Sequence, residues 1–132
     1  MNEAIKAGKV VELPKVSTIA DGAAVKVAGE RTFELLNGVI DEIVTVSDYE
    51  LMDAFLVLVE RHKLIAENAG ILALAGLHKI KEKGKKIVSV ISGGNIDVLT
   101  ISSMITKGLV SRGRIFSFSV DLTDKPGELL FF

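Results

Sequence analysis

The feature that most constrains the fold is an alternation of short β-branched runs with amphipathic helical segments. The run 42–47 (EIVTVS) precedes a segment whose apolar residues recur at spacings of three and four. A second run, 85–92 (KKIVSVIS), is nearly continuously apolar, as in a strand buried on both faces, and a helical pattern follows at 96–110. Strand, helix, strand, helix in this order predicts an α/β domain with a mainly parallel sheet and flanking helices.

The first helical segment has a clear beginning and end. Ser47 followed by Asp48 supplies an N-cap and an early acidic residue. The apolar face that follows comprises Leu51, Phe55, Leu58, His62 and Ile65. ENAG at 67–70 interrupts this pattern, and 69–84 (AGILALAGLHKIKEKG) resumes it with many small residues. We therefore expect a second, more buried helix there.

The last strand-like segment has a different pattern. In 114–122 (RIFSFSVDL), apolar and polar residues alternate, which is typical of an antiparallel strand with one face in water. We therefore expect a second kind of sheet to begin near Arg114. Pro126 and Gly127 mark a turn soon afterwards. One strand and one turn do not make a domain.

Composition excludes several classes of function. The chain has 132 residues, the size of one domain, with 17 acidic and 16 basic residues, so it has no broad positive field for nucleic acid or an anionic membrane. The absence of cysteine excludes disulfides and thiolate zinc sites and fits a reducing compartment. Neither a signal peptide nor a membrane span is recognisable. We expect a soluble, cytoplasmic protein.

A glycine pair follows the second strand-like run. Ser92, Gly93, Gly94 and Asn95 (SGGN) stand between a buried strand and a helix, where ligands bind in open parallel sheets. Glycines let the backbone approach a ligand, and the next helix offers free N–H groups. No GxGxxG or GxxxxGK[ST] sequence accompanies them. The alternative is a tight turn in which Asn95 caps the helix, and the pattern alone leaves both open.

Other polar positions are less specific. Gly22 lies in a polar turn within 17–25 (STIADGAAV), which is typical of an ordinary loop. Glu67 stands between two apolar helices, where its carboxylate either reaches solvent or lines a cavity that would raise its pKa. His62 and His78 have no metal-ligand partner at helical spacing, and no Ser-His-Asp arrangement is visible. We assign neither a catalytic residue nor a metal ligand.

The order and spacing of five segments resemble those of the threonine dehydratases, which are pyridoxal-phosphate-dependent threonine ammonia-lyases. The resemblance covers essentially the whole chain. Its segments are STIADGAAVK, DEIVTVSDYE, LIAENAG, GKKIVSVISGGNID and ISSMITKGLVSRGRIFSFSVDLTDKPGEL. It implies the fold of the type II pyridoxal-phosphate enzymes (tryptophan synthase β-like). The implied reaction converts L-threonine to 2-oxobutanoate and ammonia.

The resemblance also implies a cofactor site. Ser92 would meet the pyridine nitrogen of pyridoxal phosphate. A neutral hydroxyl leaves that nitrogen largely unprotonated. Gly93, Gly94 and Asn95 would shape the loop around the ring. Gly22 would lie beside the cofactor and Glu67 would face the ring.

The resemblance further implies a division of the chain. Residues 1–113 would be the C-terminal part of the catalytic domain, and 114–132 the truncated start of an ACT-like regulatory domain. The family's cofactor-anchoring lysine, substrate loop and phosphate-binding loop have no counterpart here. We therefore expect this chain alone to be inactive. Its expected partners are an amino-acid substrate (threonine, with serine as a second possibility) and either further copies of the chain or the remaining part of the enzyme.

Two rival hypotheses remain open. The chain could be a non-catalytic binding or oligomerisation module derived from the same family, with exposed apolar residues after Arg114 joining subunits. It could also bind a different phosphate-bearing ligand. The sequence does not decide among the allosteric effectors of the full protein.

Overall fold

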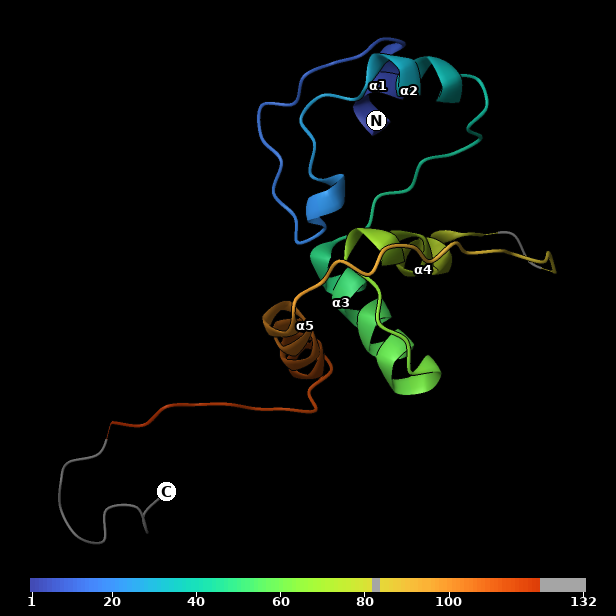
Figure 1. Ribbon diagram of the computed structural model, residues 1–132. Coiled ribbons are helices and arrows are strands. Elements are labelled where there is room, and N and C mark those ends of the chain that lie inside the picture. Colours follow the sequence, from blue (N-terminus) through green and yellow to red (C-terminus); the bar gives the residue numbers. More distant parts are fainter. Residues whose placement is uncertain (82–83, 122–132) are drawn as a thin grey trace, which may run out of the picture.

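The structure is a computed structural model that describes residues 1–81 and 84–121. Its helical elements lie between Asn2 and Ser111 and are joined by long loops (Figure 1). In chain order they are α1 (Asn2–Ala7), the 3-10 turn η1 (Asp21–Ala23), α2 (Glu30–Leu36), α3 (Asp48–Val57), the π-turn η2 (Leu58–His62), the 3-10 turn η3 (Ala69–Ile71), α4 (Leu72–Gly76), the 3-10 turn η4 (Leu77–Lys79) and α5 (Val98–Ser111).

Helix α3 begins where its sequence predicts. The Ser47 hydroxyl accepts a hydrogen bond from the Glu50 N–H at 3.3 Å. The Glu50 carboxylate accepts one from the Ser47 N–H at 2.6 Å, which completes a capping box. The helix continues into η2 and stops at Lys63, whose φ of 57° is left-handed. The predicted N-cap at Ser47 is confirmed.

The second helical segment is shorter than predicted. Three short elements, η3, α4 and η4, span 69–79, and Ile80 is already extended. The prediction of a helix as far as residue 84 is therefore wrong for the described residues up to 81. At the end of η4 the Lys79 ammonium bonds the backbone carbonyl of Thr45 and lies 3.0 Å from the Glu50 carboxylate. These tertiary contacts tie the end of η4 to the segment before α3.

If Asn95 capped α5, as in the alternative interpretation of SGGN, the helix would begin at residue 96. It begins two residues later, at Val98. Its N-cap is Asp97, whose carboxylate accepts hydrogen bonds from the Thr100 N–H at 2.9 Å and the Thr100 hydroxyl at 2.5 Å. The alternative in which Asn95 caps this helix is therefore wrong. Asn95 instead belongs to the loop that precedes the cap.

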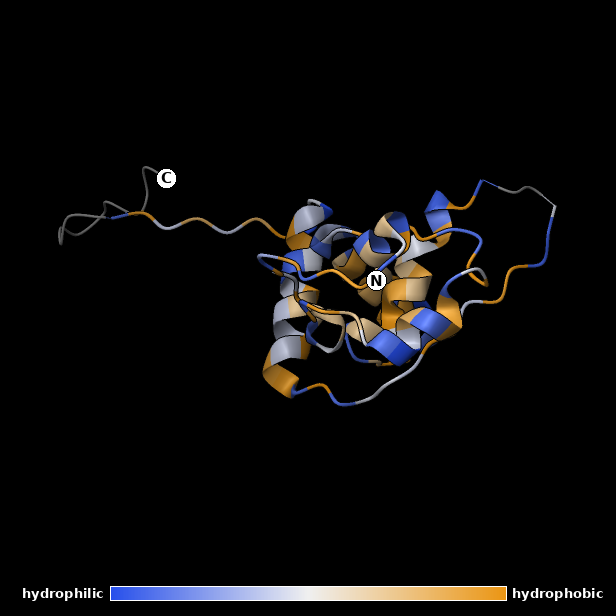
Figure 2. Cartoon of the chain, turned by 90° about the horizontal axis from the view of Figure 1, so that it is seen from above, coloured by the Kyte–Doolittle hydropathy of each residue, from blue (hydrophilic) through white to orange (hydrophobic). Residues whose placement is uncertain are grey.

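The main core lies where α3, α4 and α5 meet (Figure 1). Its largest fully buried side chains are Phe55, Leu51, Leu58 and Ile71. Helices α3 and α5 cross closely at Gly108, where a Cβ atom would lie only 2.7 Å from Leu56 Cδ1. A smaller cluster of Ala4, Ala28 and Phe33 joins α1 and α2. Orange apolar ribbon gathers among the packed helices in Figure 2, while the segment after α5 leaves them.

The predicted strands do not form a ladder within the described residues. The segments 42–47, 85–91 and 114–121 carry no strand assignment there. The one isolated bridge recorded for this part pairs Glu12 with Val27. In 85–91 the side chains of Val88 and Val90 are 88% and 69% exposed. A strand exists only when a neighbour completes its hydrogen bonds, so these segments keep a strand-like sequence without a sheet.

No helix in the described ranges is both long and apolar enough to cross a membrane. Residue 122 and the segment after it, with the turn at Pro126 and Gly127, lie outside the described residues.

Candidate functional site

Two loops predicted to carry the site are joined backbone to backbone. The SGGN loop (92–95) lies against the ENAG turn (67–70). The Glu67 N–H donates to the Gly93 carbonyl at 3.2 Å, and the Ser92 N–H donates to the Gly70 carbonyl at 3.2 Å. These bonds bring together residues that are about 25 positions apart in the sequence.

The Glu67 side chain turns toward the SGGN loop. Its carboxylate accepts a hydrogen bond from the Asn95 N–H at 3.2 Å. A Cβ atom at Gly93 would lie 2.2 Å from Glu67 Cδ, and the φ of Gly93 is +74°. At Gly70 a Cβ atom would lie 1.5 Å from the Ser92 carbonyl oxygen. Glycine is therefore required on both sides of this contact.

The TIADG turn (18–22) forms the third part of the site. A Cβ atom at Gly22 would lie 3.0 Å from Ala69 Cβ and 3.9 Å from a Glu67 carboxylate oxygen. The Asn68 amide donates to the Ile19 carbonyl at 2.8 Å. Gly22 therefore lies beside the ENAG turn, close to Glu67.

The structure places the predicted site residues in one region. Gly22, Glu67, Ser92, Gly93 and Asn95 are brought together by the contacts above. Gly94 belongs to the same loop, and its carbonyl accepts from the Ile96 N–H at 3.0 Å. A Cβ atom at Gly94 would meet nothing within 4 Å, so this glycine makes no close contact comparable with that of Gly93. The Ser92 side chain is exposed at the surface of the loop.

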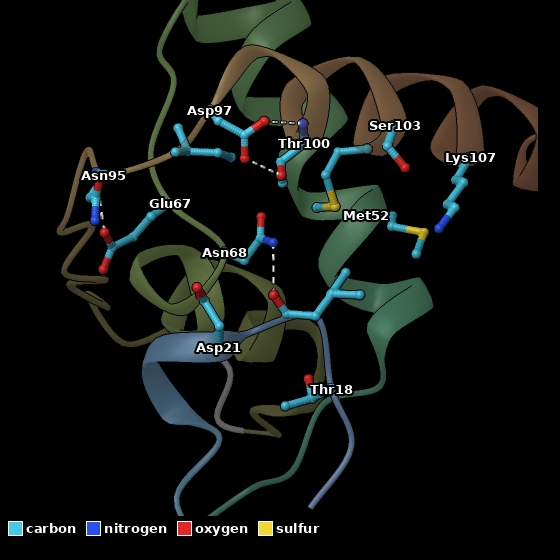
Figure 3. Close-up of a pocket in the computed structure, with 13 residues that line it drawn as sticks. Thr18, Asp21, Met52, Glu67, Asn68, Asn95, Asp97, Thr100, Ser103 and Lys107 are labelled. Carbon is cyan, nitrogen blue, oxygen red and sulfur yellow. Dashed lines mark hydrogen bonds between the residues drawn. The ribbon is translucent and has the colours of Figure 1, made fainter.

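A cavity of about 390 Å³ extends from these loops to α3 and α5 (Figure 3). Asp21, Glu67 and Asp97 supply its carboxylates, and Lys107 lies at its α5 end. Hydrogen bonds from the Thr100 hydroxyl and the Thr100 N–H lower the pKa of Asp97 from its ordinary value. Glu67 therefore does line a cavity, one of the two alternatives that its sequence position left open. The full lining is Thr18, Ile19, Asp21, Met52, Glu67, Asn68, Asn95, Ile96, Asp97, Thr100, Ser103, Met104 and Lys107.

Sequence reasoning missed three residues that organise this region. Asp48 accepts hydrogen bonds from the Thr18 hydroxyl at 2.7 Å and the Ile19 N–H at 3.2 Å. Asn68 is buried and reaches across 49 residues to Ile19. Asp97 caps α5. Only the cap at Asp97 has a local signal, an acidic residue directly before an apolar helical pattern.

The described residues contain no group of three or more His, Cys, Asp or Glu side chains that could hold a metal ion. The three loops instead contribute hydrogen-bond donors, acceptors and closely packed glycines. Such a surface suits an organic ligand with a flat face and a few polar atoms.

Comparison with known proteins decides the family. A family model described as pyridoxal-phosphate dependent enzyme matches residues 1–93. The chain belongs to this family. The matched region includes Gly22, Glu67, Ser92 and Gly93 and ends within the SGGN loop.

The similar curated proteins carry threonine ammonia-lyase names. The L-threonine ammonia-lyase of Geobacter sulfurreducens is 43% identical over 127 residues, which are 95% of this chain and 32% of that protein. The L-threonine ammonia-lyase of Thermotoga maritima is 44% identical over 130 residues, 98% of this chain and 32% of that protein. The chain thus spans about a third of the length of these relatives.

Solved structures of the same family share the fold. Threonine deaminase isoform 2 from Solanum lycopersicum superposes with a TM-score of 0.68 and 32% identity, covering 76% of this chain and 31% of that one. Maize serine racemase gives a TM-score of 0.66 and 28% identity, covering 84% of this chain and 36% of that one. The predicted fold class, part of a type II pyridoxal-phosphate enzyme, is confirmed.

The residues present fit the ring end of pyridoxal phosphate. Ser92 offers an exposed hydroxyl on the loop that contacts Glu67. Glycines at 22 and 93 keep side chains out of the space around the Glu67 carboxylate. An aromatic ring of this kind needs one polar partner at its nitrogen and a narrow space with few side chains against its faces.

Proposed function

We propose that this chain forms part of a threonine ammonia-lyase and holds the ring end of pyridoxal phosphate on its SGGN loop. The observation that carries the proposal is the meeting of the TIADG turn, the ENAG turn and the SGGN loop around Glu67. Family membership and the names of the similar proteins support the same reaction. The substrate would be L-threonine, with serine as a second amino acid to test, and the products of threonine would be 2-oxobutanoate and ammonia.

Each residue of the site has a proposed role. The Ser92 hydroxyl binds the pyridine nitrogen, and because it is neutral the nitrogen stays largely unprotonated. Gly93, Gly94 and Asn95 shape the loop around the ring. Gly22 and Glu67 lie against the ring from the other two turns. When bound, the cofactor supplies an electron sink for the substrate's α-carbon.

Covalent anchoring of the cofactor is not assigned to any residue of this chain. No lysine belongs to the meeting point of the three loops, and Lys107 lies at the opposite end of the cavity. A lysine in such enzymes acts as both nucleophile and proton carrier. We therefore expect that this chain does not turn over threonine by itself.

The remaining assignments also stay proposals. We propose that 114–132 begins an ACT-like domain after a catalytic part at 1–113, that the protein forms homo-oligomers and that it works in the cytoplasm. The described residues 115–121 carry no helix or strand assignment, and a strand there would need a neighbouring strand to complete its hydrogen bonds. Leu129, Leu130, Phe131 and Phe132, which we expect to join subunits, lie outside the described residues.

The decisive experiment measures 2-oxobutanoate formation from L-threonine with added pyridoxal phosphate. The chain is assayed alone and mixed with a polypeptide containing the part of the Thermotoga maritima relative that precedes the matched region. We expect product from the mixture and none from the chain alone. In the mixture, Ser92→Ala should lower the rate about tenfold, the equivalent of one hydrogen bond, while the exposed Ser102→Ala on α5 leaves it unchanged.

Two results would contradict this proposal. Activity from the chain alone would mean that one of its own lysines anchors the cofactor. Equal rates for the Ser92 and Ser102 variants would remove Ser92 from the site.

A second candidate function is a non-catalytic association module. The side chains of Phe116 and Phe118 are 85% and 67% exposed, and their ring centroids lie 5.6 Å apart. Apolar side chains exposed side by side favour association. Light scattering tests this candidate. The association module requires an oligomer that grows with protein concentration and that the double variant Phe116→Ser, Phe118→Ser dissociates into monomers. It also requires that the mixture in the assay above is inactive.

A further inference from the structure

The three loops of the candidate site are held together by contacts of two kinds. Backbone hydrogen bonds join the SGGN loop to the ENAG turn. The TIADG turn is joined to the ENAG turn differently. Within residues 1–81 and 84–121, the hydrogen bond recorded between these two turns runs from the Asn68 amide to the Ile19 carbonyl, at 2.8 Å.

Consecutive residues of the ENAG turn make hydrogen bonds to different loops. The Glu67 carboxylate accepts from the Asn95 N–H in the SGGN loop. The Asn68 amide reaches the TIADG turn, and Figure 3 shows the two side chains directed to different neighbours. One short turn thus connects both of the other loops.

Side chains hold the backbone of Ile19 on both sides. Its N–H donates to the Asp48 carboxylate at 3.2 Å, and its carbonyl accepts from Asn68. Asp48 also accepts from the Thr18 hydroxyl, so it anchors the turn to the beginning of α3. Loss of Asn68 would leave this anchor in place and let the turn pivot about it.

Asn68 is buried where it contacts Ile19. The residue is 6% exposed, and its carboxamide oxygen is buried without a hydrogen-bond partner in the described residues. Burying an unpaired acceptor costs free energy. The donated hydrogen bond to Ile19 is therefore the polar interaction that fixes how this side chain lies.

We propose that Asn68 is a positioning residue that sets Gly22 against Glu67, so that the two flank the same space. Gly22 follows Ile19 by three residues. A Cβ atom added at Gly22 would lie 3.0 Å from Ala69 Cβ, so the two turns approach closely there. The inference rests on the proposed cofactor site. The first experiment below tests it without the cofactor.

The first experiment measures amide hydrogen exchange on the whole chain. Asn68→Ala removes the amide, and Asn68→Leu removes it with little change in size, which keeps the core filled. The Ala23 and Ala24 N–H groups, which donate within the TIADG turn region to Ala20 and Asp21, should exchange about tenfold faster in both variants. Amides of α3 such as Phe55 should be unchanged, as should the whole pattern of the surface control Asn37→Ala.

The second experiment follows backbone amide NMR signals during a titration with pyridoxal phosphate. In the unaltered chain the signals of both Gly22 and Gly93 should shift. In Asn68→Leu the Gly93 signal should still shift, while the Gly22 response falls at least about fivefold. A purely structural role would abolish both responses or neither, and either of those results would overturn the proposal.

The two proposals fail in different ways. If neither glycine of the unaltered chain responds to pyridoxal phosphate, the proposed cofactor function is contradicted. The exchange data then still decide the role of Asn68. Unchanged exchange at Ala23 and Ala24 in both variants would overturn it.

Discussion

At the scale of single residues, two neighbouring glycines of the SGGN loop face different surroundings. Gly93 has a φ of +74°, and a Cβ atom there would lie 2.2 Å from Glu67 Cδ and 2.5 Å from Glu67 Cγ. Gly94 has no positive φ, and a Cβ atom there would meet nothing within 4 Å. The same residue type is thus required at one position and optional at the next.

This difference predicts that alanine destabilises the protein at Gly93 but not at Gly94. Gly93→Ala should lower the free energy of unfolding by about 1–3 kcal/mol, because a left-handed non-glycine residue is strained and the new methyl group displaces Glu67. Gly94→Ala, the matched control, should change it by less than about 0.5 kcal/mol. Urea unfolding of both variants measures this, and equal losses would contradict the loop geometry.

At the scale of elements, the crossing of α3 and α5 depends on a small residue. A Cβ atom at Gly108 would lie 2.7 Å from Leu56 Cδ1 and 3.3 Å from the Met52 carbonyl oxygen. At the end of this contact Arg112 donates to the Asp53 carboxylate at 2.6 Å and lies 3.5 Å from that of Glu60. The hydrogen bond to Asp53 raises the pKa of Arg112.

Gly108→Ala should therefore destabilise the protein although alanine favours helices. Overpacking costs about 1–3 kcal/mol, and the gain in helix propensity returns about 1 kcal/mol. We expect a net loss of up to about 2 kcal/mol in thermal or urea unfolding. Ser102→Ala on the exposed face of α5 is the control and should be neutral or slightly stabilising. A stabilised Gly108→Ala variant would show that the helices cross less closely.

The beginning of α3 predicts a pH dependence. The Ser47 N–H, then Lys79, then His78 hydrogen-bond the Glu50 carboxylate and lower its pKa to about 2 from an ordinary 4.5. A carboxylate with a lowered pKa in the folded state stabilises the fold above its unfolded pKa. This contribution disappears as the pH falls from about 4.5 to about 2.

Glu50→Gln should accordingly reduce the loss of stability between pH 5 and pH 2. The remaining loss comes partly from Glu60 and Asp97, whose pKa values are also lowered. Unfolding by urea at several pH values measures the slope, with Glu3→Gln on α1 as the control for removing one carboxylate. An unchanged slope in the Glu50 variant would mean that its hydrogen bonds do not persist in solution.

At the scale of the whole molecule, the segment 85–91 exposes several large apolar side chains. Ile87, Val88, Val90 and Ile91 are all exposed in the described structure, although their sequence is typical of a buried strand. The chain spans about a third of the length of its curated relatives. We infer that this segment pairs with strands from the rest of the family fold, on the same or another polypeptide.

Val88→Asp should leave the stability of this chain unchanged but prevent its assembly with the rest of the enzyme. The side chain is 88% exposed, so the unfolding free energy of this chain should change by less than about 0.5 kcal/mol. A buried, unpaired charge in the completed sheet would cost several kcal/mol and abolish the activity of the complemented mixture. Val39→Asp, at a side chain that is 73% exposed, should leave both quantities unchanged. Full activity of the Val88 variant would place 85–91 outside the sheet.

Interactions between near neighbours were readable from the sequence. The capping box at Ser47 and Glu50 needs only residues three apart, and the helical periods predicted where α3 and α5 lie. The family was implied by the resemblance of the ordered motifs. The same resemblance implied the site residues Ser92, Gly93, Gly22 and Glu67, whereas the contacts among them come from the tertiary structure.

Contacts between distant residues were decided only by the tertiary structure. Asn68 meets Ile19 across 49 positions, and nothing local distinguishes it from an ordinary turn residue. The N-cap of α5 is Asp97 and not Asn95, because the SGGN loop before it makes backbone hydrogen bonds to the ENAG turn. The strand-like segments have the sequence of strands, but a ladder requires neighbours, so the sheet was not determined by these residues alone.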